Sequence, residues 1–238
     1  MKALLAQTSQ EVGAFFNENW EFYNRTVKSN ILCHEKMFAT LDVFLRDRFS
    51  GPFSFVDCGC GDGSAVVKTL VGTPVSQYVG IDAAPDVLDS AAKVMEDLHC
   101  PKRFVCSDMA KAIDELEEPV DVIFSSYALH HLSYDQKVDF IKSCWNSLKE
   151  GGYFIMVDGV REEGETREQW LTRAEKRFIN ASLNATQEEI RSFMQHPIDA
   201  DFPETLATFE RLAKLQGWQK FSVLVNENNF LAFVVFYR

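Results

Sequence analysis

The sequence predicts an α/β fold in which helices cover a mostly parallel sheet, and three observations support this. From residue 53 onward, short apolar runs alternate with helix-compatible runs, the pattern of a parallel sheet. The apolar run 53–57 leads into a loop with glycine at 59, 61 and 63 and then into a helix-compatible run over 64–71. The last two apolar runs, 219–225 and 230–236, flank an asparagine-rich turn and predict an antiparallel hairpin.

Composition and charge limit the function classes. The chain has 238 residues, a net charge of −11 and no run of Lys and Arg, which argues against a protein that grips nucleic acid. No apolar stretch is long enough to span a membrane, and the short apolar run before Glu11 does not resemble a signal peptide. The six cysteines form no CxxC pair, so we expect reduced thiols and a cytoplasmic protein.

The N-terminal region, residues 1–50, is predicted to be a helical cap on a single domain. A first helix begins at Thr8 or Ser9, and a second runs from Ser29 or Asn30 to Arg48. Two helices bury little surface by themselves, so we do not expect this region to fold independently.

The segment 53–158 is predicted to be the ligand-binding core. After the glycine loop, each strand ends in a polar residue, and helices separate the strands. The expected strands are 77–81, 103–106, 120–124 and 153–157, and the longer helices are 85–98 and 134–148.

The alternation breaks at residues 159–200, which are charged and helical in tendency over 162–178 and 186–195. An insertion after a parallel strand lies where α/β proteins bind ligands, so we expect a lid. The segment 202–238 then resumes with a helix to Gln216 and the terminal hairpin.

The residues of the glycine loop leave two ligand classes open. A dinucleotide fingerprint, GxGxxG, requires a third glycine where Ser64 stands. The acid at Asp57 favours a cationic ligand over a pyrophosphate.

Several motifs, taken in order, resemble those of class I S-adenosylmethionine-dependent methyltransferases. They are the glycine loop 57–63, the strand end Val79–Asp82, the segment 105–109, the segment 121–132 and the turn and strand 148–157. The resemblance implies a Rossmann-like sheet of seven strands, whose last strand is antiparallel and lies between the fifth and sixth. It also implies S-adenosylmethionine as cofactor and S-adenosylhomocysteine as product.

The resemblance also assigns cofactor residues. The loop would wrap the methionine portion, Asp82 would accept the ribose hydroxyls, and the segment around Asp108 would meet the adenine. The full set is Asp57, Gly59, Cys60, Gly61, Asp82, Ala83, Ser107, Asp108, Met109, Ser125 and Ser126. The alternative is that Asp82 and Asp108 only cap the ends of their strands.

The segment after the fourth strand bears on the acceptor. It reads Ser125-Ser126-Tyr127-Ala128, without the (D/N)PP(Y/F) motif of enzymes that methylate amines of DNA bases, and the chain has no Pro-Cys dipeptide for attack on cytosine. We therefore expect an N or O atom of a small molecule as acceptor, although protein substrates stay open. The sequence gives no oligomeric state.

The catalytic candidates are His130, His131 and Tyr127, which follow this strand. One histidine is suited to be a general base with a pKa near neutrality, but a structural His-His-Leu loop is the alternative. Substrate-binding candidates are Tyr23, Asn30, His34, Asp158 and Arg161. No His, Cys, Asp or Glu spacing indicates a metal site.

Two other functions remain open from the sequence. A protein that binds the cofactor as a sensor or assembly partner needs the same loop, and a nicotinamide-dependent oxidoreductase is disfavoured by Ser64.

Overall fold

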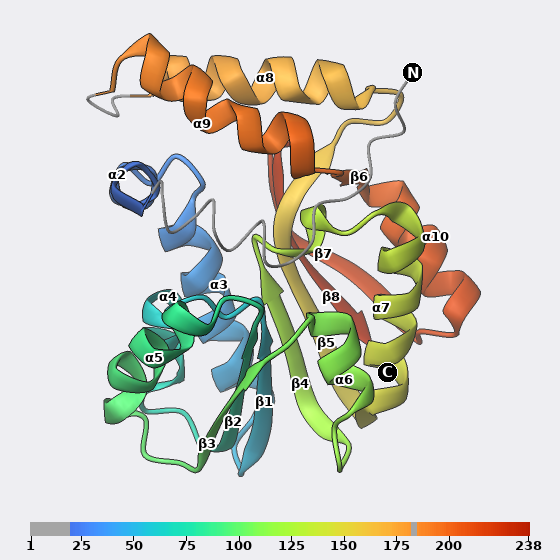
Figure 1. Ribbon diagram of the computed structural model, residues 1–238. Coiled ribbons are helices and arrows are strands. Elements are labelled where there is room, and N and C mark those ends of the chain that lie inside the picture. Colours follow the sequence, from blue (N-terminus) through green and yellow to red (C-terminus); the bar gives the residue numbers. More distant parts are fainter. Residues whose placement is uncertain (1–19, 182–184) are drawn as a thin grey trace.

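The computed structural model describes residues 20–181 and 185–238, with only the backbone of Trp20, Glu21, Tyr23 and Asn24. Its centre is a twisted sheet in the order β3-β2-β1-β4-β5-β8-β7, with the short β6 paired to β5 (Figure 1). The strands are β1 (Phe53–Cys58), β2 (Val75–Asp82), β3 (Lys102–Cys106), β4 (Val120–Ser126), β5 (Leu148–Arg161), β6 (Glu204–Thr205), β7 (Lys220–Glu227) and β8 (Leu231–Tyr237).

The sheet has the predicted topology. The pairs β1–β2, β1–β4, β2–β3 and β4–β5 are parallel, and β8 runs antiparallel between β5 and β7. All six residues of β1 are buried, as expected of a central parallel strand covered on both faces. The prediction of a mostly parallel sheet with an antiparallel last strand is confirmed.

Helices cover both faces of the sheet. The helices that the structure describes are α2 (Trp20–Lys28), α3 (His34–Arg48), α4 (Ser64–Leu70), α5 (Pro85–Val94), η1 (Met95–Asp97), α6 (Met109–Asp114), η2 (Leu129–His131), α7 (Tyr134–Ser147), α8 (Arg167–Asn180), α9 (Gln187–Ala200) and α10 (Leu206–Gln216).

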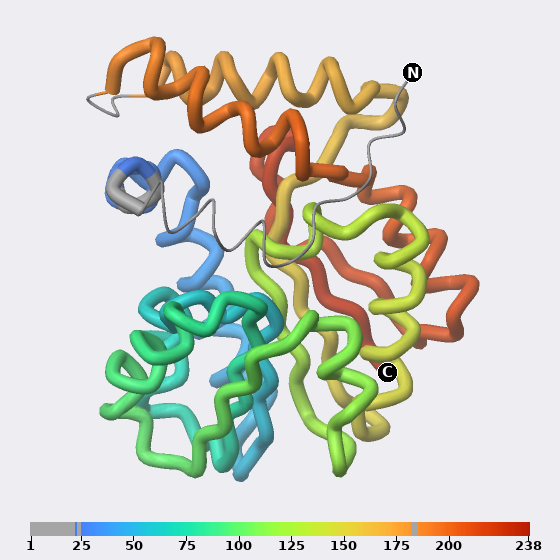
Figure 2. Tube along the Cα trace, viewed as in Figure 1, coloured from blue at the N-terminus to red at the C-terminus, as the bar shows by residue number. Residues whose placement is uncertain are grey.

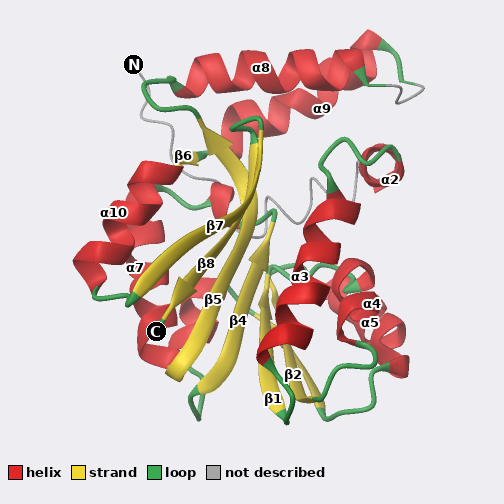
Figure 3. Ribbon diagram, turned by 180° about the vertical axis from the view of Figure 1, so that it is seen from behind, coloured by secondary structure: helices red, strands yellow, loops and turns green. Residues whose placement is uncertain are grey.

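The apolar side chains divide between the two faces. Phe53 and Phe55 of β1 join a core with α3 and α4, whereas Val56 and Cys58 join a second core with α6, α7 and α10. Figure 3 shows α3 and α4 on one side of the sheet and α7 and α10 on the other. The alternation of side chains along β1 therefore fills both cores.

The helices α8 and α9 lie across the carboxyl end of β5 and close against α2 (Figures 1 and 2). The rings of Phe22 and Phe193 stack at 4.5 Å, and Arg25 Nη2 lies 2.8 Å from Glu189 Oε1. Arg177 of α8 also donates to the carbonyl of Ile31. The 159–200 segment thus packs on the N-terminal region.

The second N-terminal helix differs from the prediction. It begins at His34, because Asn30 and Cys33 take left-handed backbone conformations, both with φ of 54°. A helix cannot pass through two such residues, so residues 29–33 form a turn between α2 and α3. The start of the first predicted helix, Thr8 or Ser9, lies outside the described residues.

Among the described residues, no helix combines the length and the apolar character needed to cross a membrane.

Candidate active site

The glycine loop joins β1 to α4 and leans on the end of β2. Gly59, Gly61 and Gly63 all have positive φ, at 73°, 53° and 70°. The N–H groups of Gly59 and Cys60 donate to the carbonyl of Ile81, at 2.8 and 3.0 Å. The loop is therefore fixed by β2, and its left-handed residues explain the glycine spacing.

Asp57 lies buried at the base of this loop. Its Oδ2 accepts a hydrogen bond from Tyr78 Oη at 3.1 Å, whereas Oδ1 has no partner among the described residues. Burial raises the pKa of the Asp57 carboxyl to about 7. On β4, the buried Ser125 Oγ also lacks a partner within the described chain. A buried oxygen without a partner is costly unless a ligand supplies one, so this base of the loop fits a polar, cationic ligand.

Asp82 ties the loop to the second strand. Its Oδ2 accepts from Gly61 N at 2.9 Å, and its Oδ1 accepts from Ala84 N at 3.0 Å. A carboxylate has about four acceptor positions, so Asp82 keeps capacity for further donors.

The third acid occupies the neighbouring strand end. Asp108 Oδ1 caps α6, accepting from Ala110 N at 2.9 Å and Lys111 N at 3.3 Å. Ser107 N donates to the Asp82 carbonyl at 3.0 Å, and the Cys106 thiol lies 3.8 Å from the carbonyl of Ala83. Met109, which follows Asp108, is buried. The predicted residues of the second and third strand ends are thus brought together. Asp108 also caps α6, whereas Asp82 holds the backbone of Gly61 and Ala84.

Tyr127 connects the end of β4 to the N-terminal turn. It has a φ of 52°, and its hydroxyl donates to the carbonyl of Leu32 at 2.6 Å. Its ring lies 4.6 Å from the ring of His34, the first residue of α3. His34 is buried, burial lowers its pKa to about 4, and its Nδ1 has no partner among the described residues. Neighbouring Ser126 ends β4 and pairs in register with Val157 of β5.

The two adjacent histidines of η2 meet two carboxylates. His130 Nδ1 donates to Asp158 Oδ1, and its backbone N donates to Asp158 Oδ2 at 3.0 Å. Asp201 Oδ1 lies 3.7 Å from His130 Nε2 and 3.3 Å from His131 Nδ1. Burial by itself would lower the pKa of His130, but Asp158 and Asp201 raise it to about 9. Burial and the neighbouring His130 lower the pKa of His131.

Sequence reasoning missed three members of this cluster: Asp201, His196 and Lys137. Asp201 follows α9, and the ring of His196 lies 5.1 Å from that of His131. Lys137 is fully buried, burial lowers its pKa to about 8, and its ammonium donates to the carbonyls of Leu132 and Phe202. A buried lysine and an acid after a helix have no distinctive spacing in the sequence.

Three predicted substrate residues already have partners in the protein. Asn30 bonds the side chain and backbone of Glu35, and both oxygens of Asp158 accept hydrogen bonds. The Arg161 guanidinium donates to the carbonyls of Pro203 and Glu165 and to Glu204. The side chain of Tyr23 lies outside the described part of the chain.

Comparison with known proteins gives one domain match and many structural matches. Residues 55–152 match the family described as "Methyltransferase domain". Uncharacterized methyltransferases of Bacillus thuringiensis (strain Al Hakam) and Bacillus mycoides (strain KBAB4) are each 25% identical over 180 residues, which is 75% of this chain and 82% of each relative.

Two solved structures show how far the fold extends. The plantazolicin methyltransferase BamL, crystallised with a triazolic desmethylPZN analog and SAH, has a TM-score of 0.66 at 15% identity, covering 96% of this chain and 94% of that chain. The magnesium protoporphyrin IX methyltransferase ChlM from Synechocystis PCC 6803, with bound SAH, has a TM-score of 0.65 at 12% identity. The match covers 97% of this chain and 100% of that chain. At these identities the likeness establishes a shared fold, which includes the regions before and after the matched domain.

Proposed function

We propose that this chain methylates an N or O atom of a small-molecule acceptor. The domain match and the fold support a class I S-adenosylmethionine-dependent methyltransferase. The observation that carries the proposal is Asp57, whose buried Oδ1 lies without a partner in the described protein at the base of the glycine loop. The cofactor has a cationic amine and a sulfonium, both of which suit a carboxylate, whereas a dinucleotide pyrophosphate would be repelled there.

The cofactor residues follow the order of the strands. We assign the methionine portion to Asp57 and the loop residues Gly59, Cys60 and Gly61, with Ser125 and Ser126 on the adjoining strand. The ribose hydroxyls are assigned to Asp82 and Ala83, because Asp82 keeps acceptor capacity beside the loop. The adenine is assigned to Ser107, Asp108 and Met109.

The acceptor is assigned to the segment that follows β4. Gly59 lies against Ala128, so a methyl group on the cofactor's sulfur would face the residues that flank Ala128. These are Tyr127, His130 and His131, with His34 beside Tyr127. When bound, S-adenosylmethionine would supply its methyl group to the acceptor atom by in-line displacement, and a proton carried by that atom would be released to water. The protein's part is to align and desolvate the two.

The remaining predicted substrate residues receive different roles. Asp158 orients His130, and Arg161 holds the start of β6 through Pro203 and Glu204, so we assign both to positioning. Asn30 shapes the turn before α3. Tyr23 stays a candidate on sequence grounds alone.

We further propose that α8 and α9 form a lid over an enclosed acceptor pocket, within a single domain that includes the N-terminal helices. Contacts of Phe22 with Phe193 and of Arg25 with Glu189 support this arrangement. An enclosed pocket and a net charge of −11 favour a small molecule over nucleic acid. All six cysteines are free thiols, which suits a reducing cytoplasm.

Calorimetry followed by turnover assays tests the proposal. We expect the purified chain to bind S-adenosylhomocysteine. We also expect it to convert S-adenosylmethionine to S-adenosylhomocysteine when a panel of amines, phenols, hydroxyls and carboxylic acids is supplied. Absence of binding to either compound would overturn the cofactor assignment. Tight binding without turnover on any acceptor class would point to a sensor or assembly protein.

A further inference from the structure

Three side chains beside the acceptor segment converge on a small volume. Suitable ligand atoms of His130, His131 and Asp201 all lie within 4.8 Å of one another. Asp201 is buried, and both histidine side chains are largely covered, with 14% and 13% exposed. A buried carboxylate needs a charged or hydrogen-bonding counterpart.

The separations suit a coordination sphere. Metal–ligand bonds of about 2.0–2.2 Å place the ligand atoms of a tetrahedral site roughly 3.3–3.6 Å apart. Asp201 Oδ1 lies 3.3 Å from His131 Nδ1 and 3.7 Å from His130 Nε2. Both distances are longer than most direct N–H···O bonds but close to the separation of two ligand atoms in a tetrahedral site.

The arrangement around His130 is that of a metal-binding histidine. Its Nδ1 donates to Asp158, so Nε2 is the nitrogen directed at Asp201. Asp158 is itself held by the backbone N–H of His130 and of Gly159, at 3.0 and 2.6 Å. A carboxylate behind a histidine fixes the ring orientation and raises its basicity as a ligand.

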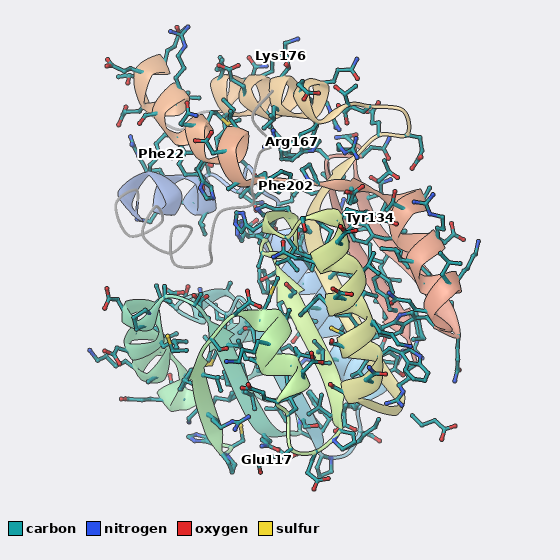
Figure 4. The ribbon with its side chains drawn as sticks, turned by 45° about the vertical axis from the view of Figure 1, so that its right-hand side comes forward. Phe22, Glu117, Tyr134, Arg167, Lys176 and Phe202 are labelled. Carbon is teal, nitrogen blue, oxygen red and sulfur yellow. The ribbon has the colours of Figure 1, made fainter. Side chains whose placement is uncertain are left out.

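The backbone fixes Asp201 against the histidine turn from several sides. Phe202 N donates to the His130 carbonyl at 2.7 Å, and Lys137 bridges the carbonyls of Leu132 and Phe202. From α8, Arg167 donates to the Asp201 carbonyl at 2.6 Å, and its guanidinium lies over the ring of Phe202. Figure 4 shows Arg167 and Phe202 at the junction of α8 and α9 with the rest of the molecule. These residues hold the ligand set in place, as a metal site requires.

We propose that His130 Nε2, His131 Nδ1 and the Asp201 carboxylate bind a divalent transition-metal ion of the zinc type. Imidazole and carboxylate ligands suit such an ion better than magnesium or calcium, which prefer oxygen. Three protein ligands leave a fourth position for water or for an acceptor oxygen, the pattern of catalytic zinc sites. The acceptor part of this inference rests on the proposed function, whereas metal binding does not.

Zinc binding to the chelator-stripped full-length chain tests the site. Competition against a chromophoric chelator should give one zinc per chain, and cobalt substitution should give the intense visible absorption of a four-coordinate site. Asp201→Asn and His131→Gln should each lower zinc affinity by about tenfold or more, because even replacing a residue that only hydrogen-bonds to a metal ligand has an effect of this size. Circular dichroism of each variant checks that it is folded.

The controls separate this site from adventitious binding. Asp199→Asn changes an acid two residues from Asp201, and His99→Gln removes an exposed histidine elsewhere, so both should keep wild-type zinc affinity. The inference is overturned if the folded wild type binds no stoichiometric zinc, if Asp201→Asn binds it as tightly, or if His99→Gln abolishes it. Calorimetry with S-adenosylhomocysteine on the same samples keeps the two proposals distinct, because cofactor binding without zinc binding overturns only the metal site.

Discussion

Gly59 and Ala128 approach so closely that a Cβ built on Gly59 would lie 2.5 Å from the Cβ of Ala128. Gly59 begins the loop assigned to the cofactor, and Ala128 lies between the candidate acceptor residues Tyr127 and His130. The contact therefore brings the two halves of the candidate site within one van der Waals distance, and no larger residue fits at 59.

Gly59→Ala should destabilise the fold and weaken binding of S-adenosylhomocysteine. The new methyl group would clash with Ala128, at a cost of about 1–3 kcal/mol for overpacking. The alanine would also have to keep the left-handed backbone conformation of Gly59, at a cost of about 1–2 kcal/mol. Urea unfolding and calorimetry measure the two effects. Gly151→Ala is the matched control, because Gly151 has a φ of 77° with nothing near its Cβ position. Adding Ala128→Gly should recover part of the loss, and independent effects of the two substitutions would contradict the contact.

Asp82→Ala should weaken S-adenosylhomocysteine binding by about 1–3 kcal/mol, the scale for losing hydrogen bonds to a charged group. The substitution removes the proposed ribose acceptor and also releases Gly61 N from its 2.9 Å hydrogen bond. Calorimetry measures the affinity, with the exposed Asp89→Ala as control. An unchanged affinity would mean that the ribose lies elsewhere.

Asp57→Asn should change how stability depends on pH. Burial raises the folded-state pKa of Asp57 to about 7 from its usual value of 3.8, so the folded protein holds this proton more tightly than the unfolded chain. The group's contribution to stability is fully present below pH 3.8 and is lost as the pH rises to about 7, by up to about 4 kcal/mol.

Urea unfolding of the ligand-free protein between pH 4.5 and 8 measures this difference. The variant should gain stability relative to wild type as pH rises, since an amide has no charge to bury and still accepts from Tyr78. Other titrating groups near Asp57, which are Tyr78, Asp82, Cys58 and Cys60, are common to both proteins. A stability difference between variant and wild type that does not change with pH would show that Asp57 ionises normally. The control Asp89→Asn should not change how stability depends on pH.

Tyr127→Phe should lower the free energy of unfolding by about 0.5–1.5 kcal/mol, the net value of one hydrogen bond. It removes the 2.6 Å bond to the Leu32 carbonyl but keeps the ring beside His34. Because Tyr127 is assigned to the acceptor side, KM for the acceptor should rise while affinity for S-adenosylhomocysteine stays unchanged. Tyr134→Phe, at an exposed position, is the control and should alter neither quantity.

Local sequence patterns predicted most of the fold. Strand–helix alternation, the glycine spacing at 59, 61 and 63, and the hairpin turn are properties of neighbouring residues, and neighbours determine periodicity and backbone conformation. The predicted helix start at Ser29 or Asn30 was wrong because Asn30 and Cys33 adopt left-handed conformations that their residue types do not require.

The acids at 57, 82 and 108 could be proposed from the sequence, because parallel strands must end at the same edge of a sheet. What the sequence alone determined is therefore the mostly parallel sheet with its terminal antiparallel hairpin, and the strand ends at which we propose that the cofactor binds. The tertiary structure decided what those residues are free to do: Arg161 and Asp158 are occupied by partners, whereas one oxygen of Asp57 has none among the described residues. It also decided that Asp201 meets His130 and His131, since about seventy residues and the three helices α7, α8 and α9 separate them and only long-range packing brings them together.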